Sequence, residues 1–260
     1  MGYLRRQQRL TLVQIQRNLC YATQDVRDAY KLIKEALLAP SCEKVVFILH
    51  SQGGIEGGLI IDWLLAELPH DVMHRLEVYT FGNAANHFNN PHKTAGDKQA
   101  AKQKGYSEPD SKSIGYIEHY ANSGDFVSRF GVLHYAHERN AFMGRVFVAL
   151  NNGHLLNQHY LHDMFPLDGK HQRALDTSRF MEMNIGFSSD GDQHVEREGP
   201  VSSLLCSSGL AEDVDGLVTD VNSPIEESPK KKVKDFSRLW QYRNGASPPD
   251  TRRAPKFFHL

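Results

Sequence analysis

The 260-residue sequence has few cysteines, no excess of charge of either sign and no long hydrophobic run. Its cysteines, Cys20, Cys42 and Cys206, are far apart and form no Cys-x-x-Cys pair. That spacing argues against a disulfide framework or a zinc site and favours a reducing compartment. The formal net charge of −1 gives no general reason to expect nucleic acid or an anionic membrane as a partner.

No segment resembles a membrane anchor or a secretory signal. The N-terminus is basic, but no apolar stretch follows it. The longest apolar run, residues 59–65, contains Asp62 and is far shorter than the roughly 20 apolar residues that cross a bilayer. We therefore expect a cytoplasmic chain without a transmembrane segment.

Apolar patterning predicts an α/β fold for the first two thirds of the chain. The predicted strands are short and apolar, and they span 45–49, 76–81, 117–121 and 145–150. Helices are predicted over 19–38 and 53–68, where apolar residues recur at helical spacing. Strands separated by helices or long connections favour a mostly parallel sheet flanked by helices. The polar stretch 87–113 is predicted to be a surface excursion.

The composition changes after about residue 186. Ser, Gly, Asp and Glu dominate up to Pro229, and such a segment buries too little apolar surface to offset its ordering entropy. We predict a domain of residues 1–185 and a disordered tail of residues 186–260, with a short helix near 236–242. The basic run Lys230–Lys234 fits a nuclear import signal, although lysine runs are also common in unstructured tails.

One short motif stands where a predicted strand meets a predicted helix, Leu49-His-Ser-Gln-Gly53. Hydrolases place a nucleophilic serine on such a tight turn, which needs small neighbours. Ser51 is therefore the candidate nucleophile, and His50, Gly53 and Gly54 complete the turn. The following helix directs its N-terminal amides and positive dipole end at the place where an oxyanion would develop. The alternative is an ordinary turn with a capping serine.

Two further residues follow predicted strands in the order that a catalytic triad requires. A serine hydroxyl attacks a carbonyl only when a base removes its proton and a third group orients that base. Asp125 follows the strand 117–121, and His154 follows the strand 145–150. Parallel strands gather their functional loops at their carboxyl ends, so we predict Asp125 as the acid and His154 as the base.

Other assignments remain open for these positions. Asp125 could instead be a turn or helix-capping residue. Competing side chains are Asp110, Asp163, His134, His137, His159 and His162. The run His134-Tyr-Ala-His-Glu138 lacks the order of a metalloprotease box, so no metal site is predicted.

The blocks Ile48-Leu-His-Ser-Gln-Gly-Gly54, Val78-Tyr-Thr-Phe-Gly82, the Asp125 segment and Gly153-His154 resemble successive blocks of the class 3 (fungal-type) lipases. The similarity covers residues 19–165 and implies an α/β-hydrolase fold. It implies Ser51 as nucleophile, Asp125 and His154 as its partners, and the Gln52 backbone N–H as an oxyanion donor. The implied activity is that of a serine esterase or lipase on small-molecule or lipid esters, without a cofactor.

The sequence departs from this family in two places. Leu49 replaces the first glycine of the usual Gly-x-Ser-x-Gly pattern, and only one helix is predicted before Val45. Such enzymes carry several strands before the nucleophile strand, and one of their loops supplies a second oxyanion donor. We therefore expect an incomplete hydrolase domain, and the alternative function is a truncated or degenerate hydrolase-fold protein that binds without catalysis.

Overall fold

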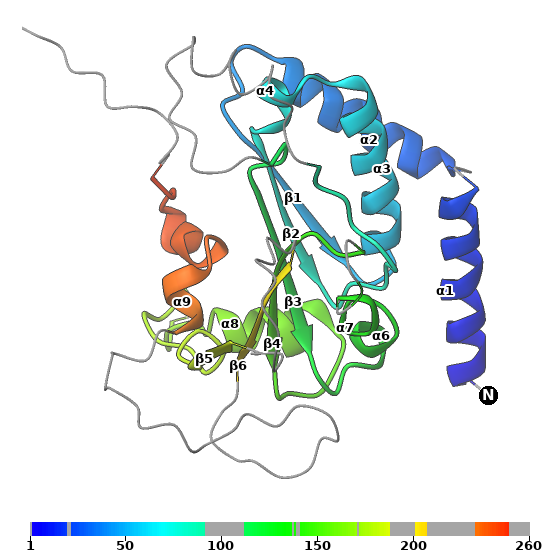
Figure 1. The fold of residues 1–260 in the computed structure, drawn as a ribbon. Coiled ribbons are helices and arrows are strands. Elements are labelled where there is room, and N and C mark those ends of the chain that lie inside the picture. Colours follow the sequence, from blue (N-terminus) through cyan, green and yellow to red (C-terminus); the bar gives the residue numbers. More distant parts are fainter. Residues whose placement is uncertain are drawn as a thin grey trace, which may run out of the picture.

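The computed structural model of the chain describes residues 2–19, 22–91, 112–136, 138, 141–170, 172–187, 201–206 and 232–249. They form an α/β fold in which a six-stranded sheet, with the order β1-β2-β3-β4-β6-β5, carries helices on both faces (Figure 1). All neighbouring strands are parallel except β5 and β6. The predicted mostly parallel sheet flanked by helices is therefore confirmed.

The four predicted strands occur within one residue of their expected bounds. The strands are β1 Val45–His50, β2 Leu76–Phe81, β3 Tyr116–Asn122, β4 Gly144–Ala149, β5 Ile185–Phe187 and β6 Val201–Cys206. The longer helices are α1 Gly2–Asn18, α2 Gln24–Leu38 and α3 Gly53–Glu67. The short ones are α4 His70–Met73, α6 Phe126–Phe130, α7 Val132–Tyr135, α8 His162–Met164, α9 Val233–Phe236, the π-helical turn η1 Leu156–Leu161 and the 3₁₀ helix η2 Leu239–Gly245. Helix α1 was not predicted, and the helix predicted from residue 19 begins at Gln24.

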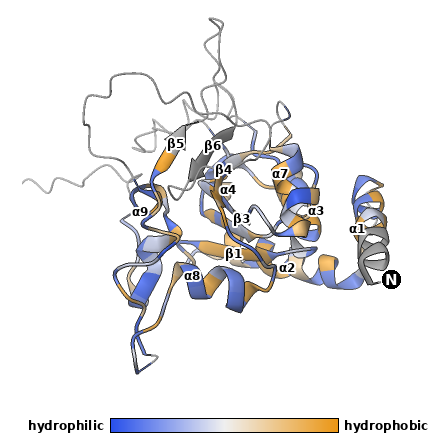
Figure 2. Cartoon of the chain, turned by 90° about the horizontal axis from the view of Figure 1, so that it is seen from below, coloured by the Kyte–Doolittle hydropathy of each residue, from blue (hydrophilic) through white to orange (hydrophobic). Residues whose placement is uncertain are grey.

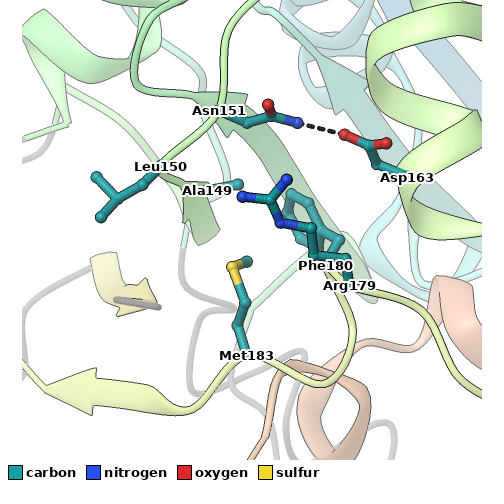
Figure 3. Close-up of a pocket in the computed structure, with 7 residues that line it drawn as sticks. All are labelled: Ala149, Leu150, Asn151, Asp163, Arg179, Phe180 and Met183. Carbon is teal, nitrogen blue, oxygen red and sulfur yellow. Dashed lines mark hydrogen bonds between the residues drawn. The ribbon is translucent and has the colours of Figure 1, made fainter. Parts of the chain in front are cut away.

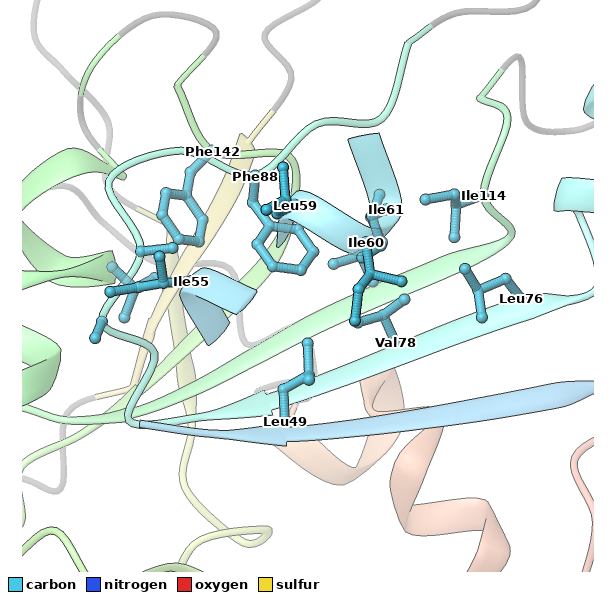
Figure 4. Close-up of a cluster of buried hydrophobic side chains, with 14 of the residues drawn as sticks. Leu49, Ile55, Leu59, Ile60, Ile61, Leu76, Val78, Phe88, Ile114 and Phe142 are labelled. Atoms are coloured by element: carbon cyan, nitrogen blue, oxygen red, sulfur yellow. The ribbon is translucent and has the colours of Figure 1, made fainter. Parts of the chain in front are cut away.

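One face of the sheet packs against α2 and α3. Side chains alternate between the two faces along a strand, so Leu49 of β1 and Val78 of β2 both point to this face. There they cluster with Ile60 of α3 (Figure 4). Ile61 and Leu64 are completely buried here. Seen from below in Figure 2, β1 is coloured hydrophobic along most of its length, as expected for an apolar run.

The opposite face carries aromatic rings from three neighbouring strands. Phe81 of β2 stacks on Tyr120 of β3 at 5.3 Å, and Tyr120 stacks on Phe147 of β4 at 5.2 Å. Tyr160 of η1 and Trp240 of η2 cover this second core. The C-terminal elements thus lie across the sheet from α2 and α3 (Figure 1).

Residues 232–249, here called the C-terminal strap, pack on this aromatic face. The Glu118 carboxylate accepts hydrogen bonds from the backbone N–H groups of Arg238 (2.8 Å) and Leu239 (3.2 Å). The Arg238 Nε–H donates to Glu77 Oε1 at 2.8 Å, and both side chains are buried. These bonds cap the N-terminus of η2 with a carboxylate from the middle of the sheet.

Two stretches of the predicted tail belong to the described structure. Residues 201–206 pair with β4, and residues 232–249 pack on the aromatic face. The predicted short helix exists, but as η2 it lies three residues further on, at 239–245. The remainder of 186–260 lies outside the described residues.

Part of the predicted import signal is built into the fold. Lys232 and Lys234 both bond to the Glu182 carboxylate, and Val233 between them is completely buried. Lys230 and Lys231 lie outside the described residues, and nuclear location stays a prediction. Within the described ranges, no helix is long and apolar enough to cross a membrane.

The predicted polar excursion is correct only in part. Phe88 and Ile114, which lie near its two ends, are completely buried, and Phe88 bridges to Phe142. The Asn90 side chain donates to the Ile114 carbonyl at 3.1 Å. Both ends of the excursion are therefore anchored in the core, while residues 92–111 are not described.

Candidate active site

Ser51 occupies the turn between β1 and α3 in an uncommon backbone conformation. Its φ of 59° lies in the left-handed region, which costs a non-glycine residue roughly 1–3 kcal/mol. Three backbone bonds hold it there: Ser51 N–H donates to the Phe81 carbonyl at 3.0 Å, and the Ser51 carbonyl accepts from Gly54 at 3.0 Å and Ala84 at 3.2 Å. Strain held by surrounding bonds is typical of a functional turn.

The glycines of this turn differ in their importance. A Cβ on Gly54 would lie 2.0 Å from the Asn83 side-chain oxygen, so this position admits only glycine without a rearrangement. A Cβ on Gly53 would meet nothing within 4 Å. On Gly57 it would clash with the Leu49 side chain at 2.4 Å, which explains how α3 lies so close to the sheet.

The three predicted residues Ser51, Asp125 and His154, here called the triad, lie together. His154 Nε2 is 2.8 Å from Ser51 Oγ, and His154 Nδ1 is 2.9 Å from Asp125 Oδ2. An ionised carboxylate only accepts, so Nδ1 carries the hydrogen and Nε2 is left to accept the serine proton. This arrangement can remove a proton from the Ser51 hydroxyl and stabilise the imidazolium that results.

Asp125 is completely buried and accepts four hydrogen bonds. Its Oδ2 accepts from His154, from the Tyr160 hydroxyl at 2.6 Å and from the Ser128 hydroxyl at 3.1 Å. Its Oδ1 accepts from the Val127 N–H at 2.9 Å, so Asp125 is also the N-cap of α6. Burial alone would raise the pKa of Asp125, but the bonds from His154 and Tyr160 outweigh it and the pKa is lowered. The carboxylate therefore stays ionised.

Residues that were not predicted complete the surroundings of the carboxylate. These residues are Tyr160, Ser128 and Gly82. Gly82 directly follows β2 and has a φ of 54°. A Cβ there would lie 2.7 Å from Asp125 Oδ2 and 3.2 Å from His154 Nδ1. A glycine directly after a predicted strand was the signal for this position, whereas Tyr160 and Ser128 left none in the sequence.

The loop that carries His154 is held by side chains from two strands. Asn122 of β3 donates through Nδ2 to the carbonyls of Gly153 (3.3 Å) and His159 (3.0 Å). His50 of β1 lies 2.7 Å, through Nε2, from the His154 carbonyl. Burial lowers the pKa of His50 by more than the contact with the His154 carbonyl raises it.

Gln52 directly follows Ser51 at the N-terminal end of α3. Its side chain donates to Glu56 Oε1 at 2.8 Å along the helix surface. Its backbone N–H lies at the positive end of the helix dipole, where an anion is stabilised. Its role as an oxyanion donor stays a prediction.

The competing side chains have other contacts. His159 Nδ1 accepts the Leu155 N–H at 3.0 Å, Asp163 bonds to Asn151, and the His134 ring contacts Tyr135. His162 lies in α8, whereas Asp110 and His137 lie outside the described residues. No group of three or more potential metal ligands occurs in the described part of the chain.

A small pocket lies at the end of β4, but it contains no member of the triad. Figure 3 shows Asn151 bonded to Asp163 at its wall. Its lining residues are Ala149, Leu150, Asn151, Asp163, Arg179, Phe180 and Met183. The shape of this pocket therefore says nothing about what binds at Ser51.

No protein-family model matches the chain, and no match was found among the curated proteins or the solved structures. The chemistry of the site is therefore inferred from the arrangement of its own side chains.

Proposed function

We propose that this protein is a serine hydrolase of the α/β-hydrolase type that cleaves carboxylic esters of small molecules or lipids. The observation that carries the proposal is the pair of hydrogen bonds on His154, 2.8 Å to Ser51 Oγ and 2.9 Å to Asp125 Oδ2. The left-handed Ser51 turn at the start of α3 supports it. The resemblance of the sequence to class 3 lipases points to the same reaction.

In the proposed reaction, Ser51 Oγ attacks the ester carbonyl carbon while His154 Nε2 takes the hydroxyl proton. Asp125 keeps the imidazole oriented and stabilises its positive charge. The tetrahedral oxyanion develops at the N-terminus of α3, where the Gln52 N–H donates to it. Collapse of the intermediate breaks the bond to the alcohol, which leaves with the proton from His154. Water then attacks the acyl-serine by the same route and releases the carboxylic acid.

A hydrolase-fold protein that binds without catalysis is the second candidate. Among the described strands, β1 pairs with β2 alone, and its Val46 and Ile48 are 41% and 55% exposed. Exposed apolar side chains beside the site suit a binding partner. A site with Gln52 as its single oxyanion donor would react about 10²–10³-fold more slowly, which would leave a weak enzyme.

A fluorophosphonate probe separates the two candidates, because it reacts only with an activated serine. We expect the purified chain to be labelled at Ser51, and Ser51→Ala to abolish labelling. Ser41→Ala, the same change on an exposed loop, is the control and should be labelled like the wild type. Labelling that persists in Ser51→Ala would refute the proposed nucleophile, and no labelling of well-folded wild-type protein would favour the binding protein.

A further inference from the structure

His50 lies directly before Ser51 and faces the imidazole of His154. The two ring centroids are 4.7 Å apart, with 30° between the ring planes. His50 Nε2 lies 2.7 Å from the His154 carbonyl oxygen. A carbonyl only accepts hydrogen bonds, so Nε2 carries a hydrogen and the second nitrogen of a neutral His50 carries none.

We propose that His50 is a positioning residue that holds the catalytic base and switches the site off when it becomes protonated. This inference rests on the proposed hydrolase function. His50 would fix the backbone of the base, His154. The hydrogen bonds of His154 to Ser51 and Asp125 do not do this, because they hold only its side chain.

The loop before His154 needs such support. Gly153 has a φ of 98°, a conformation that few residues other than glycine adopt, so this part of the loop has no regular structure of its own. Asp125 fixes only the Nδ1 end of the imidazole. Asn122 holds the Gly153 carbonyl and His50 holds the next one, so two strands together fix the backbone from which the imidazole extends.

The charges around His50 explain why it must stay neutral. The titratable groups facing it are His154, Asp125 and Tyr160, whose ring centroid is 6.4 Å away. Burial and the Asp125 charge raise the pKa of Tyr160, so its hydroxyl keeps its proton, and the Asp125 charge is already bonded to His154. A second positive charge 4.7 Å from the imidazolium would therefore meet no free counter-charge among these groups.

The repulsion between the two protonated rings is large enough to change how the labelling rate depends on pH. Two unit charges at this separation in a half-buried site disfavour the second proton about ten- to a hundredfold. The two rings then take up protons in two separate steps that belong to the pair, and the second proton binds at a lower pH than the first. Below both steps, the reaction requires the loss of two protons rather than one.

The pH dependence of labelling tests the switch. For the wild type, we expect the logarithm of the fluorophosphonate labelling rate to fall towards acid with a slope that approaches two. His50→Gln keeps a side-chain N–H donor but cannot titrate, so its slope should stay at one. Its rate should match the wild type within threefold at pH 8 and exceed it by about two- to tenfold near pH 4.5. Equal slopes in the two proteins would overturn the proposal.

Three comparisons complete the experiment. His50→Phe keeps a ring without the hydrogen bond and should lower kcat about tenfold at every pH with KM within twofold. His162→Gln makes the same change as His50→Gln on an exposed helix, and it should leave the slope at two. Circular dichroism at each pH establishes that the compared proteins are folded.

A measurement without catalysis separates this inference from the proposed function. Histidine NMR titration should show His50 taking up its proton at a pH about one unit or more higher in His154→Gln than in the wild type, because the repulsion between the rings is gone. An unchanged pKa would overturn the coupling of the two rings. This shift, found when the probe does not label the folded wild type, would refute the hydrolase function while the coupling stands.

Discussion

Replacement of Asp125 by asparagine changes one charged oxygen and almost no volume. The carboxylate accepts from His154, Tyr160 and Ser128 on Oδ2 and from the Val127 N–H on Oδ1. An asparagine amide has only one accepting oxygen, so its NH₂ group must face donors on one side. If it faces His154, the imidazole takes the other tautomer, with the hydrogen on Nε2. That tautomer cannot accept the Ser51 proton.

The expected loss of activity is much larger than the loss of stability. With the wrong tautomer, kcat should fall about 10⁴-fold, the size of effect measured for this change in serine proteases. That factor corresponds to about 5–6 kcal/mol of lost transition-state stabilisation. Loss of a charged hydrogen bond should lower the free energy of unfolding by about 1.5–3 kcal/mol, which lowers Tm by roughly 3–12 °C for a chain of this size.

The assay compares labelling rates at Ser51 with melting temperatures for the wild type, Asp125→Asn and Asp163→Asn. Asp163 bonds to Asn151 outside the triad, so its replacement should change the labelling rate less than threefold. A folded Asp125→Asn protein that is labelled within tenfold of the wild-type rate would refute the assigned role of Asp125.

The same variant has a defined effect on acid stability. Because the folded state lowers the pKa of Asp125, its contribution to stability is fully present above the unfolded value of about 4. That contribution is lost as the pH falls through the lower, folded value. Asp125→Asn should therefore lose less stability than the wild type when the protein is titrated from pH 5 to pH 2 and followed by urea unfolding.

Two further substitutions test how the site and the sheet are supported. Gly82→Ala places a Cβ 2.7 Å from Asp125 Oδ2, so the labelling rate should fall at least tenfold. Because the φ of residue 82 is 54°, the left-handed backbone should also lower the free energy of unfolding by about 1–2 kcal/mol. Gly169→Ala, which has open space around it, is the control and should behave as the wild type. Arg238→Met removes the buried guanidinium from Glu77 and leaves that carboxylate with Lys44 at 3.5 Å, so thermal unfolding should show a loss of about 1.5–3 kcal/mol. Arg243→Met removes a surface pair and should cost about 1 kcal/mol or less. An unchanged Tm in Arg238→Met would show that the ion pair does not hold the strap.

The sequence was sufficient to locate four of the six strands and to predict that Ser51, Asp125 and His154 lie near one another. The apolar run from Val45 is bounded by polar residues, and each candidate side chain follows a strand directly. In a parallel sheet those positions share one edge, so three residues far apart in the sequence could be expected to meet. This reasoning depends only on strand order and direction, which short-range patterns reveal.

The parts that could not be predicted depend on polar contacts between distant residues. Tyr160 bonds to Asp125 from a π-helical turn, and Arg238 bonds to Glu77 across 161 positions of the chain. Such contacts leave no apolar periodicity in the sequence. Apart from a short helix near 236–242, the strap was predicted to be disordered because the segment before it is polar, although Val233 and Trp240 are buried against the sheet.

The distance along the chain between the strap and the strands it covers has a consequence for synthesis on the ribosome. Glu77 and Glu118 are translated long before Arg238, which closes over them. Until Arg238 is synthesised, the part of the aromatic face that the strap covers is exposed to chaperones and to other chains. A chain that ends upstream of Arg238 would therefore contain the triad but lack the strap that covers the aromatic face.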